Sequence, residues 1–272
     1  MSIEKITEWA KQNPNVIALV LTGSQAREQI DEFSDYDIEI ISKNPEELKF
    51  STDWFNNFGQ VAVFLPFDEG QDYPSRLVVY KDGTKVDFTL ADEGRLRSQK
   101  EKLDGLYDRG YKIILDKTGI TKILPKPTGR ASHGLPTKNE YLRAVNEFWF
   151  EASHIPKYLL REDLWVVKFR DWTMKEMLLR MLGWHTLSQS PNSDIWHIGS
   201  KMKEWLEPEV WKELNGIFSH FDRKDSWKGL LAELSLFRKV SKEVANNLGF
   251  EYPEETDKTI SRYVQSYKNR FK

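Results

Sequence analysis

The first half of the chain alternates short runs of β-branched and other apolar residues with turn residues. Runs of this length and composition are typical of β-strands. Asp82-Gly83 separates two of the runs, and this dipeptide suits a tight hairpin because glycine accepts the positive φ that such turns need. The pattern therefore predicts strands at 16–22, 36–42, 61–65, 76–80, 85–90 and 111–115.

After Pro125 the apolar residues recur every three to four positions, which is the period of an amphipathic helix. Helices are expected at 141–160, 174–187, 200–206, 209–218 and 227–248. A stretch rich in Pro and Gly, without any period, separates the two patterns. We therefore expect an N-terminal domain (1–125), a linker (126–137) and a C-terminal helical bundle (138–272).

Composition narrows the class of protein. The 272 residues carry 40 Lys and Arg against 42 Asp and Glu, so a binder that works by neutralising phosphates of nucleic acid is disfavoured. The absence of Cys excludes disulfides, thiolate metal sites and cysteine nucleophiles. No apolar run approaches the length of a membrane span. We expect a cytoplasmic protein that binds neither membrane nor nucleic acid.

The first chemical motif is a Gly-Ser turn at the end of the strand 16–22. Gly23 allows the backbone to approach a phosphate, and Ser24 offers a hydroxyl and an amide where the chain 25–29 begins a predicted helix. The same pattern is also typical of an ordinary turn with a capping serine.

Two carboxylates lie at the start of the next predicted strand. Asp35 and Asp37 share one face because side chains alternate along a strand. They repel each other unless a cation lies between them, and hard oxygen ligands of this kind suit Mg²⁺. The alternative is an edge strand with a solvated acidic face, to which Glu39 would also belong.

A third carboxylate, Asp87, projects opposite to Val86 and Phe88 in the strand 85–90. If this strand neighbours the strand 36–42, Asp87 joins Asp35 and Asp37. Three convergent carboxylates suit two divalent ions about 3.5–4 Å apart, an arrangement used for in-line displacement at phosphorus. Otherwise Asp87 is an exposed polar position of a hairpin.

These motifs carry a resemblance. A Gly-Ser turn, an Asp-x-Asp strand ten residues later and a further strand carboxylate resemble the signature of the nucleotidyltransferase superfamily related to DNA polymerase β. Within it, the chain resembles the aminoglycoside 6-adenylyltransferases (streptomycin adenylyltransferases) over nearly its whole length. The C-terminal half contributes four similar stretches, at 146–149, 178–184, 237–245 and 252–254. Gln25 is a departure, since the family has Arg after the Gly-Ser pair, and the basic residue here comes at Arg27.

The resemblance implies an α+β fold: a nucleotidyltransferase domain with a mixed β-sheet and flanking helices, followed by the helical bundle. It implies transfer of AMP from ATP to a hydroxyl of an aminoglycoside such as streptomycin, with release of pyrophosphate. Asp35 and Asp37 would bind Mg²⁺, with two ions expected, and Asp87 would be the third metal ligand or the general base.

Cations for the triphosphate are expected from both halves of the chain. Lys201 resembles the lysine of a helix that reaches the triphosphate in the broader family, and the alternative is an ordinary surface helix. Arg27, on the turn after Ser24, is a second candidate, with a surface charge as its alternative.

The acceptor site is expected to use acidic and aromatic side chains, because aminoglycosides are polycations. Glu147 and Glu151 share one face of a predicted helix, and Trp149 lies between them in sequence. The alternative is that Trp149 belongs to the core and both glutamates are solvated. We expect ATP and a polycationic small molecule as partners of a monomer. A nucleotidyltransferase acting on a protein or RNA end, and a catalytically silent binding protein, are the alternative functions.

Overall fold

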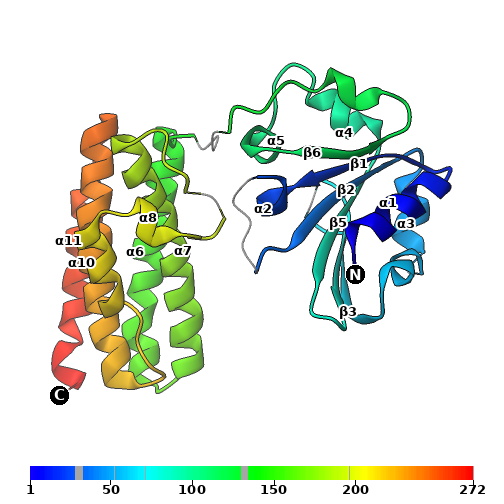
Figure 1. Cartoon of the computed structure of the whole chain (residues 1–272). Coiled ribbons are helices and arrows are strands. Elements are labelled where there is room, and N and C mark those ends of the chain that lie inside the picture. The colour runs from blue at the N-terminus through cyan, green and yellow to red at the C-terminus, as the bar shows by residue number, and fades with distance from the viewer. Residues whose placement is uncertain (28–32, 52, 71, 130–133, 196, 272) are drawn as a thin grey trace. The chain divides into compact units, whose positions relative to one another are not determined.

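The computed structural model describes residues 1–27, 33–51, 53–70, 72–129, 134–195 and 197–271. The chain forms two compact units, Met1–Ser132 and His133–Lys272. The first contains a β-sheet with flanking helices and the second is helical (Figure 1). The predicted α+β class is therefore confirmed.

The sheet of the N-terminal unit has six strands in its described part, in the order β3-β4-β5-β2-β1-β6. Neighbouring strands run antiparallel except β2 and β5, which are parallel. Each predicted strand is present, and the ends of β1 and β2 agree with the prediction. The strands are β1 (Val16–Thr22), β2 (Tyr36–Ser42), β3 (Val61–Phe67), β4 (Ser75–Tyr80), β5 (Lys85–Ala91) and β6 (Lys112–Asp116).

The hairpin between β4 and β5 has the predicted turn. Gly83 has a φ of +84°, and its amide donates to the carbonyl of Tyr80 at 2.9 Å. A residue with a β-carbon is strained in this left-handed conformation. The turn fixes the register in which β5 leaves β4, and therefore the face on which Asp87 lies.

Two apolar clusters cover opposite faces of the sheet. One packs α1 (Ile3–Gln12), α3 (Pro45–Phe50) and the 3₁₀ helix η1 (Trp54–Phe58) against residues such as Ile38 and Phe88. The other packs α4 (Glu93–Ser98) and α5 (Gly105–Arg109), through Leu96 and Tyr107, against residues such as Val20 and Ile41. The remaining elements are α2 (Gly23–Ala26) and η2 (Ile120–Ile123).

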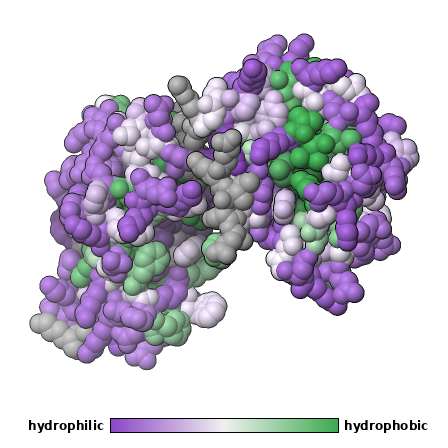
Figure 2. Space-filling model, in the orientation of Figure 1, coloured by the Kyte–Doolittle hydropathy of each residue, from purple (hydrophilic) through white to green (hydrophobic). Residues whose placement is uncertain are grey.

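Some apolar side chains of this unit remain at its surface (Figure 2). Val63, Leu65 and Phe67 on β3, and Ile113 on β6, are among the large exposed ones. β3 and β6 are the two outermost strands of the described sheet.

The C-terminal unit is built mainly from four long helices. A capping box between Thr137 and Glu140 begins α6. The bounds are α6 (Lys138–Leu160), α7 (Leu164–Gln189), α8 (Met202–Trp205), α9 (Pro208–Glu213), η3 (Leu214–Gly216), α10 (Arg223–Leu248), α11 (Glu254–Ser266) and η4 (Lys268–Phe271). No helix in the described ranges is both long and apolar enough to span a membrane.

Four predictions for the helical unit differ from the structure. The helices expected at 200–206 and 209–218 are shorter, because α8 covers Met202–Trp205 and α9 ends at Glu213. α7 begins at Leu164, ten residues before the predicted start, because its first turns carry exposed aromatic side chains that obscure the apolar stripe. α11 was not predicted, since only Asp257 and Val264 among its residues are fully buried. The core of the unit includes a stacked pair, Phe148 and Phe237, with ring centroids 3.6 Å apart.

Candidate active site

The register of the sheet brings the predicted carboxylates together. In the parallel pair, Asp37 of β2 lies opposite Asp87 of β5, and Asp37 also lies opposite Thr22 of β1. The condition set by the sequence, that the strand of Asp87 neighbours the strand of Asp37, is therefore met. The edge-strand alternative is wrong, because β2 is paired on both sides.

Gly23 closes one side of this group. Its φ is +66°, and a β-carbon on it would lie 1.9 Å from Oδ2 of Asp37. Only glycine therefore lets the turn after β1 pass so close to the carboxylate. Ser24 follows in the four-residue helix α2, and residues 28 and 29 of the predicted helix lie outside the described residues.

A lysine that carries none of the predicted site motifs lies between two of the carboxylates. Nζ of Lys85 donates to Oδ2 of Asp35 at 3.0 Å and to Oδ2 of Asp87 at 3.2 Å. Burial lowers the pKa of Lys85, but the hydrogen bonds and charges of both aspartates outweigh it and raise the pKa above its usual value. A cation of the chain itself therefore lies between Asp35 and Asp87. Its position two residues before Asp87, on the same face of β5, was the available signal.

A buried network supports the same face of β2. Glu39 is 3% exposed and accepts two hydrogen bonds from Arg95, at 3.1 and 3.0 Å, and one from the hydroxyl of Tyr107, at 2.7 Å. Burial and the charge of Glu39 raise the pKa of Tyr107. Arg95 also pairs with Asp104 at 2.5 Å. The solvated acidic face considered for this strand is therefore wrong at Glu39, because Arg95 and Tyr107 reach it from α4 and α5.

The donor set fits a divalent metal ion in its chemistry. Asp37 and Asp87 offer hard oxygens from adjacent strands, and Asp35 offers another from the residue directly before β2. Oδ1 of Asp87 is buried and has no hydrogen-bond partner among the described residues, so this oxygen is available to a ligand. In the described ranges, however, no three acidic or histidine side chains lie close enough to surround an ion as they stand. Lys85 lies between Asp35 and Asp87, in the position from which both carboxylates would contact an ion.

Arg27 remains next to the turn. Its Nε donates to the carbonyl of Gly23 at 3.2 Å, and a β-carbon on Gly110 would lie 3.1 Å from its Cγ. Arg27 thus lies beside Gly23, the residue whose backbone was expected to meet phosphate.

Lys201 lies in the C-terminal unit, directly before the four-residue helix α8. It is exposed and has a φ of +52°. His197 and Ile198, a few residues earlier, also have positive φ values, of +51° and +49°. A non-glycine residue in this region is uncommon.

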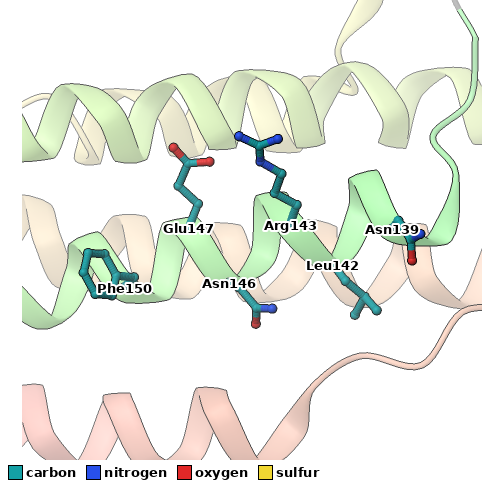
Figure 3. Close-up of a pocket in the computed structure, with 6 residues that line it drawn as sticks. All are labelled: Asn139, Leu142, Arg143, Asn146, Glu147 and Phe150. Atoms are coloured by element: carbon teal, nitrogen blue, oxygen red, sulfur yellow. The ribbon is translucent and has the colours of Figure 1, made fainter.

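The three predicted acceptor residues are in different environments. Trp149 is fully buried in the core of the helical unit, with Arg238 over its ring at 5.4 Å. This placement favours the alternative in which Trp149 packs in the core. Glu151 pairs with Arg170 at 2.7 Å. Glu147 lines a shallow pocket on α6, where it projects on the same side as Arg143 (Figure 3).

The structure also shows an aromatic stripe that the sequence analysis did not select. Trp165, Phe169 and Trp172 of α7 are 80%, 70% and 58% exposed. Their spacing puts them on one face of the helix. Phe150 of α6 is exposed as well. Aromatic faces at the surface are able to bind the cations of a ligand. Trp149 is buried and its ring already faces Arg238.

A mixed sheet that joins a Gly-Ser turn to two strand carboxylates, with a third directly before β2, is the arrangement expected of the nucleotidyltransferase superfamily related to DNA polymerase β. A family model described as streptomycin adenylyltransferase matches residues 1–267. Because the match spans nearly the whole chain, the chain belongs to this family of nucleotidyltransferase enzymes.

Individual relatives agree with this membership. The chain is 28% identical over 270 residues to an aminoglycoside 6-adenylyltransferase of Bacillus subtilis, covering 95% of this chain and 93% of the relative. It is 26% identical to one of Campylobacter jejuni, covering 98% and 94%. A crystal structure of an aminoglycoside 6-adenyltransferase from Bacillus subtilis matches with a TM-score of 0.50 at 23% identity, over 98% of this chain and 97% of that one. This last likeness supports the fold.

Proposed function

We propose that this enzyme transfers AMP from ATP to a hydroxyl of an aminoglycoside, with streptomycin as the first acceptor to test, and releases pyrophosphate. The observation that carries the proposal is the position of Asp37 opposite Asp87 in the parallel pair of strands, beside Gly23. The family and the names of the relatives support the acceptor class. The proposed enzyme acts as a cytoplasmic monomer and does not bind nucleic acid.

In the proposed mechanism, Gly23 and Ser24 bind the phosphates of ATP through the backbone of the turn, with Arg27 adjacent. Asp35 and Asp37 hold Mg²⁺, with two ions expected. When bound, the metal neutralises negative charge on the reacting phosphate and the leaving pyrophosphate. Lys201 supplies a further cation to the triphosphate.

Asp87 has two roles open to it in this proposal. As general base, it takes the proton from the acceptor hydroxyl as that oxygen attacks phosphorus. As third ligand, it binds metal through the same carboxylate. The buried, unpartnered Oδ1 supports either role, since it is available to a proton or an ion. Both roles require Asp87 to remain on the face that carries Asp37.

The acceptor's positive groups are assigned to acidic side chains of α6. Glu147 is the stronger candidate, because Glu151 is already paired with Arg170. Trp149 has no face at the surface, so its proposed contribution is limited to supporting α6 from within.

The test is an acceptor screen with the purified full chain, ATP and Mg²⁺. Pyrophosphate release is measured with streptomycin, other aminoglycosides, a protein extract or RNA as acceptor. Mass spectrometry then tests whether the acceptor has gained the mass of one AMP group. We expect transfer to an aminoglycoside and its loss in Asp37→Asn. Transfer to protein or RNA alone would select the corresponding alternative. No transfer to any acceptor, with ATP still bound, would support the silent binding protein.

A further inference from the structure

One ammonium group contacts two of the three site carboxylates. Nζ of Lys85 lies 3.0 Å from Oδ2 of Asp35 and 3.2 Å from Oδ2 of Asp87. Lys85 and Asp87 are two residues apart on β5, and Asp87 lies opposite Asp37 on β2. Lys85 therefore lies on the same face of the sheet as Asp37 and Asp87, and it reaches Asp35 directly before β2.

The contacts are of a kind that can be exchanged. The side chain of Lys85 is 38% exposed and that of Asp35 is 44% exposed, so neither is locked in a closed core. Ion pairs with this exposure are individually weak. Asp87 is less exposed, at 26%, and its second oxygen has no partner among the described residues. The geometry is that of a carboxylate pair held by a cation that has room to move away.

We propose that Lys85 is a positioning residue that holds Asp35 and Asp87 together in the free enzyme and competes with divalent metal ions for them. This inference rests on the proposed function, in which these carboxylates bind metal. Oδ2 of each aspartate already contacts the ammonium of Lys85. A metal ion that binds through these oxygens must displace the ammonium, and one that binds Oδ1 of Asp87 is repelled by its charge. The triphosphate of the nucleotide offers the displaced ammonium a new anionic partner. Lys85 thereby weakens metal binding in the absence of nucleotide, and it couples the binding of metal to the binding of nucleotide.

A purely structural lysine would behave differently. If Lys85 only held Asp35 and Asp87 in place, its removal would lower stability and free the two carboxylates to move apart, which weakens metal binding. Removing a competing cation leaves two neighbouring carboxylates without their counter-charge, which favours a divalent ion. The sign of the change in metal affinity therefore separates the two roles.

The experiment measures the binding of Mn²⁺ alone to the full chain by calorimetry at neutral pH. Mn²⁺ stands in for Mg²⁺, since both prefer oxygen ligands. Lys85→Met is compared with wild type, with Lys85→Arg, which keeps the charge, and with Lys81→Met, an exposed lysine of the same hairpin. Loss of two weak ion pairs predicts that Lys85→Met binds Mn²⁺ about 2- to 30-fold more tightly than wild type. Lys85→Arg and Lys81→Met are expected to stay within about twofold.

A second titration separates this inference from the proposed function. Mn²⁺ is added together with a non-hydrolysable ATP analogue to wild type and to Asp37→Asn. Tight joint binding to wild type and weak binding to Asp37→Asn supports the metal site. If wild type shows this joint binding but Lys85→Met binds Mn²⁺ alone no more tightly than wild type, the proposed competition by Lys85 is wrong, whereas the proposed metal site is supported. If neither wild type nor variant binds Mn²⁺ under any condition, both are overturned. Circular dichroism of each variant shows that it is folded.

Discussion

A β-carbon on Gly23 would lie 1.9 Å from Oδ2 of Asp37, far inside any real contact. Gly23 also has a φ of +66°, a conformation that side chains disfavour. The turn after β1 and the carboxylate of β2 thus exclude any residue but glycine at this position. The close approach ties the predicted phosphate-binding turn to the predicted metal ligand.

Gly23→Ala is therefore expected to displace Asp37 or the turn. Displacement of a catalytic group by about 1 Å lowers rates about 100-fold, so we expect at least that loss in kcat/KM for adenylyl transfer. Gly83→Ala is the control, because Gly83 also has a positive φ but has nothing within 4 Å of the added carbon. Equal activity losses in the two variants would show that backbone strain, and not the approach to Asp37, is responsible.

Asp87→Asn tests the third carboxylate. Loss of a general base lowers kcat by about 100- to 10,000-fold. Steady-state kinetics and calorimetric titration with an ATP analogue and Mg²⁺ separate its two roles. Unchanged nucleotide affinity indicates a base, whereas weaker binding of the metal–nucleotide pair indicates a ligand. Asp72→Asn, at an exposed carboxylate of the same unit, is expected to retain activity. An Asp87→Asn enzyme within a few-fold of wild type would contradict both roles.

Arg95→Met tests the buried network beneath β2. It leaves Glu39 charged and buried without its main partner, which destabilises a protein by about 3–5 kcal/mol. Tyr107→Phe removes one hydrogen bond to the same carboxylate and is expected to lower stability by about 2 kcal/mol. Arg97→Met breaks only an exposed pair with Glu93 and serves as control. Urea unfolding measures each change, and an Arg95→Met loss no larger than that of Arg97→Met would refute the role of the network.

Asp257→Asn tests a pH dependence in the helical unit. Burial raises the pKa of Asp257, but hydrogen bonds from Arg238, Ser261 and Tyr252 outweigh it and lower the pKa below its usual value. Because the folded pKa is lowered, the stabilisation is present above the unfolded pKa of about 3.9 and is lost as the pH falls through the folded value. We expect Asp257→Asn to cost about 2 kcal/mol at pH 7, since Arg238 is partly exposed.

The measurement for Asp257 is urea unfolding of both proteins from pH 7 to pH 3. The difference between wild type and Asp257→Asn is expected to narrow below about pH 4. A difference that stays constant across this range would mean that the charge of Asp257 does not contribute to stability. The effect of Asp257→Asn would then come from altered packing or hydrogen-bond geometry alone.

Lys201→Ala tests the proposed cation for the triphosphate. A lost charge-assisted contact of about 1.5–3 kcal/mol corresponds to a roughly 10- to 150-fold lower kcat/KM. Calorimetry with an ATP analogue is expected to show weaker binding. Lys203→Ala, at an exposed lysine within α8, is the control. Wild-type affinity in Lys201→Ala would remove this residue from the proposed site.

Patterns of neighbouring residues establish the class of the fold and the face of each strand. Alternation along β2 and β5 placed Asp37 and Asp87 opposite to buried residues such as Ile38 and Phe88, and that assignment depends only on the two-residue period of a strand. The Asp82-Gly83 turn was equally local, because four consecutive residues decide it. The resemblance to the adenylyltransferases also followed from the order and spacing of short motifs.

The tertiary structure alone decided which of these faces meet and which charges are paired. Arg95 and Tyr107 lie 56 and 68 residues from Glu39, so no local pattern shows that the glutamate is buried. Lys85 reaches Asp35 across 50 residues, and only the pairing of β2 with β5 creates that contact. Trp149 lies within a predicted helix and Trp172 lies two residues before another. Both are tryptophans, yet tertiary packing buries Trp149 and leaves Trp172 at the surface. Burial and ion pairing depend on neighbours distant in sequence, whereas strand and turn patterns depend on adjacent residues.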